Sequence, residues 1–279
     1  MLPTPSTSHV SFDTIYEPAE DSYLFLDTLS SREEAAWLSQ RFNVVAAHSL
    51  SPSTNSPSPI IVEVGTGSGV VLAFVAAHAN HIFGRKDILT LGTDVNSNAC
   101  IATCQTVRLA LDEERSSGSQ KIENTDAIRL TKSGTYLLAA ITADLCAPLR
   151  SGIVDVLIFN PPYVPTPELP DIPSHIEGQF PSVSPSKFER DSYLLSLSFA
   201  GGEYGMETTN RLLDSIPDIL HPERGVAYVL LCAQNNPEEV QTRIRNWGSG
   251  WTVQTVAQSG VKAGWERLVI IRIWRKIPL

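Results

Sequence analysis

Short apolar runs alternate along the chain with segments whose apolar residues recur every three or four positions. Runs of four to eight apolar residues are typical of strands, and the longer amphipathic segments are typical of helices. Strands that alternate with helices predict an α/β fold. The strands are expected at 60–64, 89–94, 136–142, 156–159, 225–231, 251–257 and 266–273.

Helices are expected between most of these strands, at residues 22–38, 70–79, 96–111, 206–220 and 238–247. The first begins near Asp21 or Ser22, because acidic and hydroxyl side chains are favoured in the first helical turn. More polar groups crowd this start than a helix cap needs. The last two strands have no helix between them, so they are predicted to pair antiparallel.

The chain is predicted to be a single domain over residues 12–279, preceded by a disordered tail. Residues 1–11 are rich in serine, threonine and proline, a composition that disfavours a packed core. Inserted loops, marked by serine, proline, glycine and charged residues, are expected near 39–59, 111–125 and 168–198. Residues 165–187 are either a rim over the substrate or a plain surface insertion.

The stretch Asp155-Val-Leu-Ile-Phe-Asn-Pro-Pro-Tyr163 combines a buried strand with an abrupt stop. Proline cannot donate to a sheet and pushes the preceding residue out of the helical region. Asn160 is therefore expected at the carboxyl end of a strand, where open α/β sheets bind ligands. An isolated Asn-Pro-Pro is also a common turn. The other motifs of the chain are therefore needed to distinguish a simple turn from a ligand-binding site.

Asn160, Pro161 and Tyr163 are the candidate catalytic residues. The Asn160 side-chain oxygen and the Pro161 carbonyl could accept the two N–H bonds of an amide or amino group. Tyr163 could stack on the plane of that group. Rigid residues of this kind suit a reaction in which a nitrogen must be aimed at its target.

A glycine-rich turn follows the strand at 60–64. Gly65 and Gly67 flank Thr66, so the backbone can approach a ligand closely, and the next helix would point its free N–H groups there. The G-x-G-x-G spacing differs from the G-x-G-x-x-G dinucleotide fingerprint. Glu63 is an acidic residue inside an apolar strand and predicts a cationic ligand group nearby.

Acidic residues also end the next two strands. Asp94 could bind both hydroxyls of a ribose, and Asp144 could accept from an adenine amino group while Leu145 packs on the ring. Each aspartate alone could also be a cap or a solvated loop residue. Three acidic groups beside one glycine turn, without a phosphate-binding lysine, fit S-adenosylmethionine better than NAD.

Composition narrows the function classes further. The chain has 279 residues, 42% of them hydrophobic, and a net charge of −9, which disfavours a dedicated nucleic-acid binder. The four cysteines form no C-x-x-C pair, and no signal-peptide pattern precedes them. The cysteine spacing predicts reduced thiols that bind no metal. Together with the missing signal-peptide pattern, reduced thiols indicate a protein of the cytoplasm, or of both the cytoplasm and the nucleus. No apolar run reaches membrane-spanning length.

Together these motifs resemble the class I S-adenosylmethionine-dependent methyltransferases, and most closely their eukaryotic and archaeal HemK-like branch. The resemblance rests on Tyr16-Glu-Pro-Ala-Glu-Asp-Ser22, Glu63-Val-Gly-Thr-Gly-Ser-Gly69 and Asn160-Pro-Pro-Tyr163, in that order. It extends from Tyr16 to near the C-terminus, although residues 174–197 do not align. It implies a Rossmann-like, seven-stranded, mostly parallel sheet with one antiparallel strand and helices on both faces.

The resemblance also implies a reaction and a partner. HemK-like proteins of this branch methylate the glutamine of the Gly-Gly-Gln loop in class I translation termination (release) factors. Eukaryotic members form a heterodimer with a small zinc-binding activator, and the predicted edge strand at 136–142 would bind it. The implied contacts to S-adenosylmethionine come from Ser22, which replaces a family threonine, and from Glu63, Gly65, Thr66, Gly67, Asp94, Asp144, Leu145 and Asn160.

Three other functions remain open at this point. The N-P-P-Y motif also serves adenine-N6 methylation of DNA, in which the base is flipped into the site. The resemblance allows lysine methylation of histone tails as well. The third alternative is a catalytically silent nucleotide-binding subunit, and the retained Asn160–Tyr163 motif argues against it.

Overall fold

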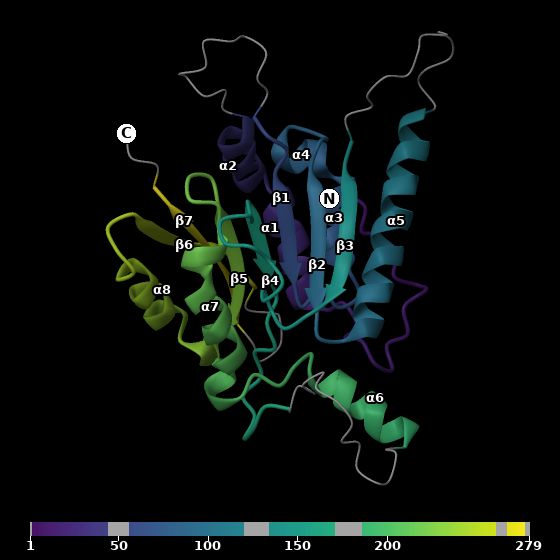
Figure 1. Cartoon of the computed structure of the whole chain (residues 1–279), viewed down its shortest axis with the longest axis vertical. Helices are drawn as coiled ribbons and strands as arrows, with labels where there is room; N and C mark the ends of the chain where they lie inside the picture. The colour runs from purple at the N-terminus through teal and green to yellow at the C-terminus, as the bar shows by residue number, and fades with distance from the viewer. Residues whose placement is uncertain (1, 44–55, 120–133, 171–185, 261–266, 277–279) are drawn as a thin grey trace.

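The computed structural model describes residues 2–43, 56–119, 134–170, 186–260 and 267–276. Seven strands form one sheet in the order β3-β2-β1-β4-β5-β7-β6 (Figure 1). The first five strands in this order, β3 to β5, run parallel to one another, whereas β7 is antiparallel to both β5 and β6. The predicted α/β fold with one antiparallel strand is therefore confirmed, including the antiparallel pairing of the last two strands.

The strands lie close to their predicted positions because their apolar runs are short and sharply bounded. Their bounds are β1 Ile60–Val64, β2 Leu89–Asp94, β3 Tyr136–Thr142, β4 Val156–Phe159, β5 Val226–Cys232, β6 Trp251–Gln258 and β7 Leu268–Arg275.

The helices are α1 Glu20–Ser30, α2 Arg32–Asn43, α3 Val70–Ala77, α4 Ala79–Phe83, α5 Ser97–Ser119, α6 Lys187–Ser196, α7 Glu207–Ile219 and α8 Pro237–Arg245. Two short 3₁₀ turns cover Glu203–Gly205 and Ala233–Asn235. Within the described ranges, no helix combines the length and hydropathy that a membrane span requires.

Two helix predictions are wrong in their extent. The single helix expected at 22–38 is two helices, because Ser31 between them has an extended backbone, with φ −61° and ψ 149°. The loop expected from residue 111 is instead a continuation of α5 as far as Ser119. Residues 113–115 are good helix formers, and the Arg115 guanidinium lies 3.3 Å from the Asp112 carboxylate one turn earlier.

The sheet separates two apolar cores. Alternate residues of a strand point to opposite faces, so Val156 and Ile158 of β4 pack with α1 to α4, whereas Leu157 and Phe159 pack with α7 and α8. Figure 1 shows α7 and α8 together on one face of the sheet. Because both faces are covered, the carboxyl ends of the parallel strands form an accessible edge for a site.

The N-terminal segment differs from the disordered tail that was predicted for residues 1–11. Val10 is buried in a small cluster with Ile15 and with two alanines of α5. The His9 Nε2 lies 3.1 Å from the Thr106 hydroxyl, and the His78 Nε2 lies 2.9 Å from the Pro3 carbonyl. These contacts with α5 and with His78, which lies between α3 and α4, give the segment a defined position that its composition does not reveal.

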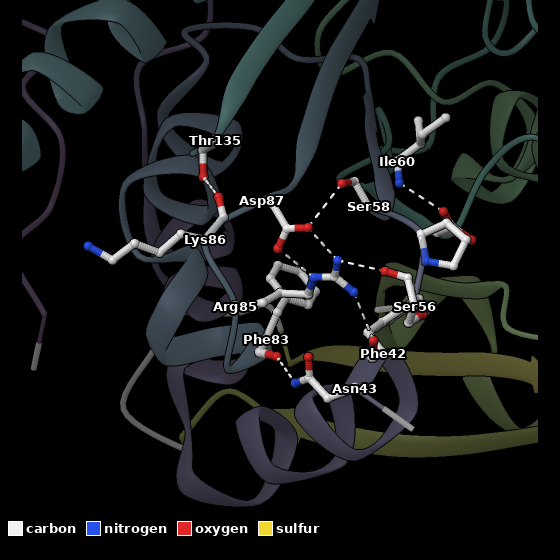
Figure 2. Close-up of polar contacts among 12 residues, drawn as sticks. Phe42, Asn43, Ser56, Ser58, Ile60, Phe83, Arg85, Lys86, Asp87 and Thr135 are labelled. Carbon is white, nitrogen blue, oxygen red and sulfur yellow. Dashed lines mark hydrogen bonds and ion pairs between the residues drawn. The ribbon is translucent and has the colours of Figure 1, made fainter. Parts of the chain in front are cut away.

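A cluster around Arg85 joins four segments, as Figure 2 shows. The guanidinium donates to Asp87, to the Phe42 carbonyl at 3.0 Å and to the Ser56 carbonyl at 2.8 Å. The hydrogen bonding from Arg85 to Asp87 is the largest cause that lowers the pKa of the Asp87 carboxyl. Phe42 and Ser56 both lie within the insertion predicted near 39–59, on either side of residues 44–55, which are outside the described part of the chain. The two described parts of the insertion therefore meet at the Arg85 side chain.

Candidate active site

A cavity opens at the carboxyl ends of β1, β2 and β4. Its lining includes all but one of the residues predicted to contact cofactor or substrate, namely Ser22, Glu63, Gly65, Thr66, Gly67, Asp94, Asp144, Leu145, Asn160 and Pro161. These residues come from widely separated parts of the chain, and the sheet topology brings them together. Their individual roles stay predictions, but their shared location is observed.

Tyr163 is the exception. Its ring is partly buried and packs against the core on the α1–α4 side of the sheet, outside the cavity lining. Its carbonyl accepts from the Asn235 side chain at 3.3 Å, which fixes the chain leaving the Asn-Pro-Pro turn. Tyr163 therefore lies outside the cavity lining, and the stacking of its ring on the substrate amide stays a prediction.

The glycine turn provides a backbone cradle for a ligand. Gly65 and Gly67 have φ of 63° and 53°, a region that side-chain-bearing residues avoid. Gly69 has φ of 77°, and a Cβ there would lie 2.6 Å from the Thr103 Cα of α5. The turn can thus pass between the cavity and α5 only because these positions lack side chains.

Asp94 is held in place by two backbone donors. Its Oδ2 accepts from the Gly67 N–H at 2.9 Å, and its Oδ1 accepts from the Asn96 N–H at 2.8 Å. Burial raises the pKa of this carboxyl, and the backbone hydrogen bonds oppose that effect. Each carboxylate oxygen has a further lone pair for an acceptor contact, which fits the predicted grip on two ribose hydroxyls.

Glu63 is buried at the inner wall of the cavity. Its Oε2 accepts from the Thr66 hydroxyl at 2.9 Å and from the Leu72 N–H at 3.0 Å. Burial raises the pKa of Glu63 to about 8, and the nearby Asp94 adds to the rise. A cationic group in the cavity would favour the ionised form, as expected for a site that binds a positive ligand.

Glu63 should make the stability of the ligand-free protein fall as pH rises from about 4.5 to about 8. In this window folded Glu63 keeps a proton that the unfolded chain has lost, so each rise in pH favours unfolding. The penalty reaches on the order of 4 kcal/mol at the alkaline end. Glu63→Gln should remove it, as measured by urea unfolding at several pH values.

The exposed Glu33→Gln is the matched control for this measurement, since Glu33 lies on the surface of α2. It should keep the pH dependence of the unmodified chain. Equal pH slopes for the Glu63→Gln variant and the unmodified chain would contradict the assignment.

Asn160 presents an acceptor to the cavity. Its Nδ2 donates to the Oδ2 of Asp21 at 3.0 Å. Its Oδ1 is buried and has no hydrogen-bond partner in the described part of the chain. A buried acceptor without a partner is unfavourable, so this oxygen is suited to an N–H group of a bound ligand. Sequence reasoning missed Asp21 as a site residue, although the polar crowding before α1 was a signal.

Asp144 has a partner that the sequence did not predict. Its carboxylate forms an ion pair with Arg211 of α7, which also lines the cavity. The Asp144 carboxylate, which was expected to accept from an adenine amino group, thus also accepts from the Arg211 guanidinium. The site was expected to have no phosphate-binding lysine, but Arg211 gives it a cation whose charge Asp144 offsets. Nothing in the local pattern around Arg211 marked it as a site residue.

Comparison with known proteins identifies the family. Methyltransferase HEMK2 of Mus musculus is 30% identical over 265 residues, which are 94% of this chain and 94% of that protein. The chain belongs to the HEMK2 family of methyltransferases. This confirms the predicted family, the methyltransferase class and its cofactor, S-adenosylmethionine.

Other relatives agree in length. The eRF1 methyltransferase catalytic subunit mtq2 of Schizosaccharomyces pombe is 29% identical over 279 residues, covering 99% of this chain and 96% of the yeast protein. The E. cuniculi Mtq2–Trm112 complex, responsible for methylation of the eRF1 translation termination factor, is a solved structure with 19% identity and a TM-score of 0.49. It covers 94% of this chain and 99% of that chain. None of the protein-family models searched matches the chain.

The rim of the cavity in this HEMK2-family chain comes from two segments without predicted site residues. Thr14 and Ile15 line it from the N-terminal side, and Leu169, Leu194 and Leu197 line it from the segment after the Asn-Pro-Pro turn. Figure 1 shows α6 beyond the carboxyl ends of β1, β2 and β3. Of the two readings of the segment around 165–187, a rim fits its described residues, and residues 171–185 lie outside them.

Proposed function

We propose that this chain is an S-adenosylmethionine-dependent methyltransferase that methylates a glutamine side-chain nitrogen. The glutamine is that of the Gly-Gly-Gln loop in a class I translation termination factor, so we also assign the protein to the cytoplasm. The observation that carries the proposal is the buried Asn160 Oδ1 at the wall of the cavity, an acceptor without a hydrogen-bond partner among the described residues. The HEMK2 family and the yeast eRF1 methyltransferase support the substrate.

The cavity residues fit S-adenosylmethionine. The glycine turn leaves room for the backbone of Gly65 and Gly67 to approach the cofactor, and Asp94 is fixed for a ribose. Glu63 supplies a buried carboxyl near the expected positive charge. Ser22, Thr66, Asp144 and Leu145 complete the proposed cofactor site, with Leu145 against the adenine and Asp144 near its amino group.

The residues of the Asn-Pro-Pro turn would aim the reacting nitrogen. S-adenosylmethionine supplies the electrophilic methyl group when it is bound. Asn160 Oδ1 accepts one N–H of the substrate amide and the Pro161 carbonyl accepts the other, so the nitrogen points at the methyl group. As the N–C bond forms, the bond between the methyl group and the cofactor sulfur would break with its electron pair left on sulfur, and one N–H proton would leave to solvent. The methylated nitrogen is acidic enough that no strong general base is needed.

A partner subunit would bind at the β3 edge of the sheet. Tyr136 and Leu138 are 54% and 51% exposed, and Ile101 and Leu109 of the neighbouring α5 are also exposed. An open strand edge beside exposed apolar side chains favours association. We infer that a small zinc-binding activator adds a strand here, in line with the family resemblance.

A charge at the β3 edge should disrupt this heterodimer. Leu138→Lys should weaken binding of the activator about tenfold or more, because it places a cation where an apolar contact is expected. Dissociation of the co-expressed and co-purified complex on dilution, followed by analytical ultracentrifugation, measures the change. The chain alone should be poorly soluble, and co-expression with the activator should rescue it.

Phe188→Lys is the matched control, because Phe188 of α6 is 79% exposed and α6 lies beyond the carboxyl ends of the strands, outside the sheet (Figure 1). It should leave activator binding unchanged. A Leu138→Lys variant that binds as tightly as the unmodified chain would refute the proposed docking strand.

Localisation of the methyl group tests the proposed reaction. The chain, co-expressed with the activator, is incubated with S-adenosylmethionine and with termination factor, histone or duplex DNA, followed by mass spectrometry. A methyl on the Gly-Gly-Gln glutamine is the expected result. A methyl only on lysine or adenine would overturn the substrate, and no transfer despite bound cofactor would favour a silent subunit.

A further inference from the structure

Asp21 lies buried at the start of α1, directly against Asn160. It is 3% exposed, and its Oδ2 accepts from the Asn160 Nδ2 at 3.0 Å. Its Oδ1 accepts from the Ser22 N–H at 2.7 Å and from the Ser22 hydroxyl at 3.4 Å. Both carboxylate oxygens therefore face donors, one on the backbone of α1 and one on the amide of Asn160.

This arrangement determines which end of the Asn160 amide faces the cavity. An ionised carboxylate can only accept hydrogen bonds, so the group next to it must be the amide nitrogen. The amide is planar, and the Asn160 oxygen is then turned away from Asp21 as the buried atom without a partner. Rotation of the amide by half a turn would set oxygen against oxygen and present N–H groups to the substrate.

We propose that Asp21 is a positioning residue for methyl transfer, which fixes the Asn160 amide with its oxygen toward the substrate nitrogen. This inference rests on the proposed function and adds a residue to it. The carboxylate is needed because it has two acceptor oxygens for two donors. Asp21 acts through its hydrogen bond to Asn160 and needs no contact of its own with the substrate.

An asparagine at position 21 could not replace the carboxylate. Its single oxygen can accept from the Ser22 N–H or from Asn160, while its NH₂ group faces the other. If the oxygen stays on Ser22, Asn160 must turn its own oxygen toward position 21. The Asn160 NH₂ group then faces the substrate amide, donor against donor, and the acceptor is lost from the cavity.

Exchanging the two residues should restore the arrangement. In the double variant Asp21→Asn with Asn160→Asp, the new amide accepts from Ser22 and donates to one oxygen of the new carboxylate. The second oxygen of that carboxylate faces the substrate as an acceptor. The single variant Asn160→Asp instead places two carboxylates at the 3.0 Å contact, which like charges disfavour.

The test is a mutant cycle on the full chain in complex with its activator, using a termination factor as substrate. Asp21→Asn should lower kcat about 10²-fold, as expected when an oriented acceptor is lost, and should leave the dissociation constant of S-adenosylmethionine within about threefold. The exchanged variant should regain at least about tenfold of that loss. The exposed Asp27→Asn on the same helix is the control and should keep the original kcat.

The outcomes separate this inference from the proposed function. If the unmodified complex transfers no methyl to glutamine, the proposed function fails. If it does, an Asp21→Asn variant with unchanged kcat overturns the positioning role. Should Asp21→Asn also lower the melting temperature, the exchanged variant decides: recovery of kcat supports the role, and a kcat no higher than that of Asp21→Asn refutes it.

Discussion

Asn160→Ala should lower kcat about 10³-fold and leave the binding of S-adenosylmethionine nearly unchanged. The variant removes the buried Oδ1 that would accept the substrate N–H while the methyl group is transferred. Removing one preoriented contact of this kind costs about 10²–10³ in turnover, and the amide nitrogen is a poor nucleophile that depends on its aim. Single-turnover kinetics and cofactor titration measure the two quantities separately.

Asn80→Ala is the matched control for this variant. Asn80 is an exposed asparagine of α4, outside the cavity lining, so its removal should change neither quantity. If Asn160→Ala weakens cofactor binding as much as it lowers kcat, the role of Asn160 in aiming the substrate is wrong.

Glu34→Ala should destabilise the fold by roughly 3–5 kcal/mol, because it leaves a buried arginine without its counter-charge. Both carboxylate oxygens of Glu34 lie 2.8 Å from the Nη1 of Arg272, and the Tyr228 hydroxyl donates to Glu34 at 2.8 Å. The Arg272 guanidinium carbon lies 3.9 Å from the centroid of the Trp37 ring and 4.6 Å from that of the Trp274 ring. Urea unfolding measures the loss.

The double variant Glu34→Leu with Arg272→Met is the control for this prediction. Replacing both charges with apolar side chains of similar size removes the unpaired charge, so most of the lost stability should return. The remaining loss comes from the buried Tyr228 hydroxyl, which no longer has its acceptor on Glu34. A double variant as unstable as Glu34→Ala would show that lost packing, and not the unpaired arginine, causes the effect.

The strand positions and the location of the site could be predicted because their signals are local. An apolar run that ends at Asn160-Pro-Pro gives both the strand β4 and its carboxyl end. The run ending in Glu63-Val-Gly does the same for β1. Because parallel strands share one edge for their carboxyl ends, the two motifs had to meet at the cavity where the structure places them.

The ends of the helices were predicted less well, because the apolar spacing that indicates a helix can continue across a point where the backbone leaves the helical conformation. The break at Ser31 interrupts a sequence whose apolar spacing continues on both sides of it. The tail was misjudged for a related reason: the burial of Val10 depends on α5, which begins almost ninety residues later. The composition of a segment indicates whether it would be ordered by itself. Packing against a distant helix can order a segment whose composition alone predicts disorder.

The sequence by itself determined the family, the order of strands along the chain and the residues gathered at the cavity. Only the tertiary structure decided the partners of those residues. Asp21 and Asn160 are 139 positions apart, Asp144 and Arg211 are 67 apart, and Glu34 and Arg272 are 238 apart. Periodicity and motifs specify which way a side chain points along its own element. The partner it meets depends on how elements far apart in the chain pack around the sheet.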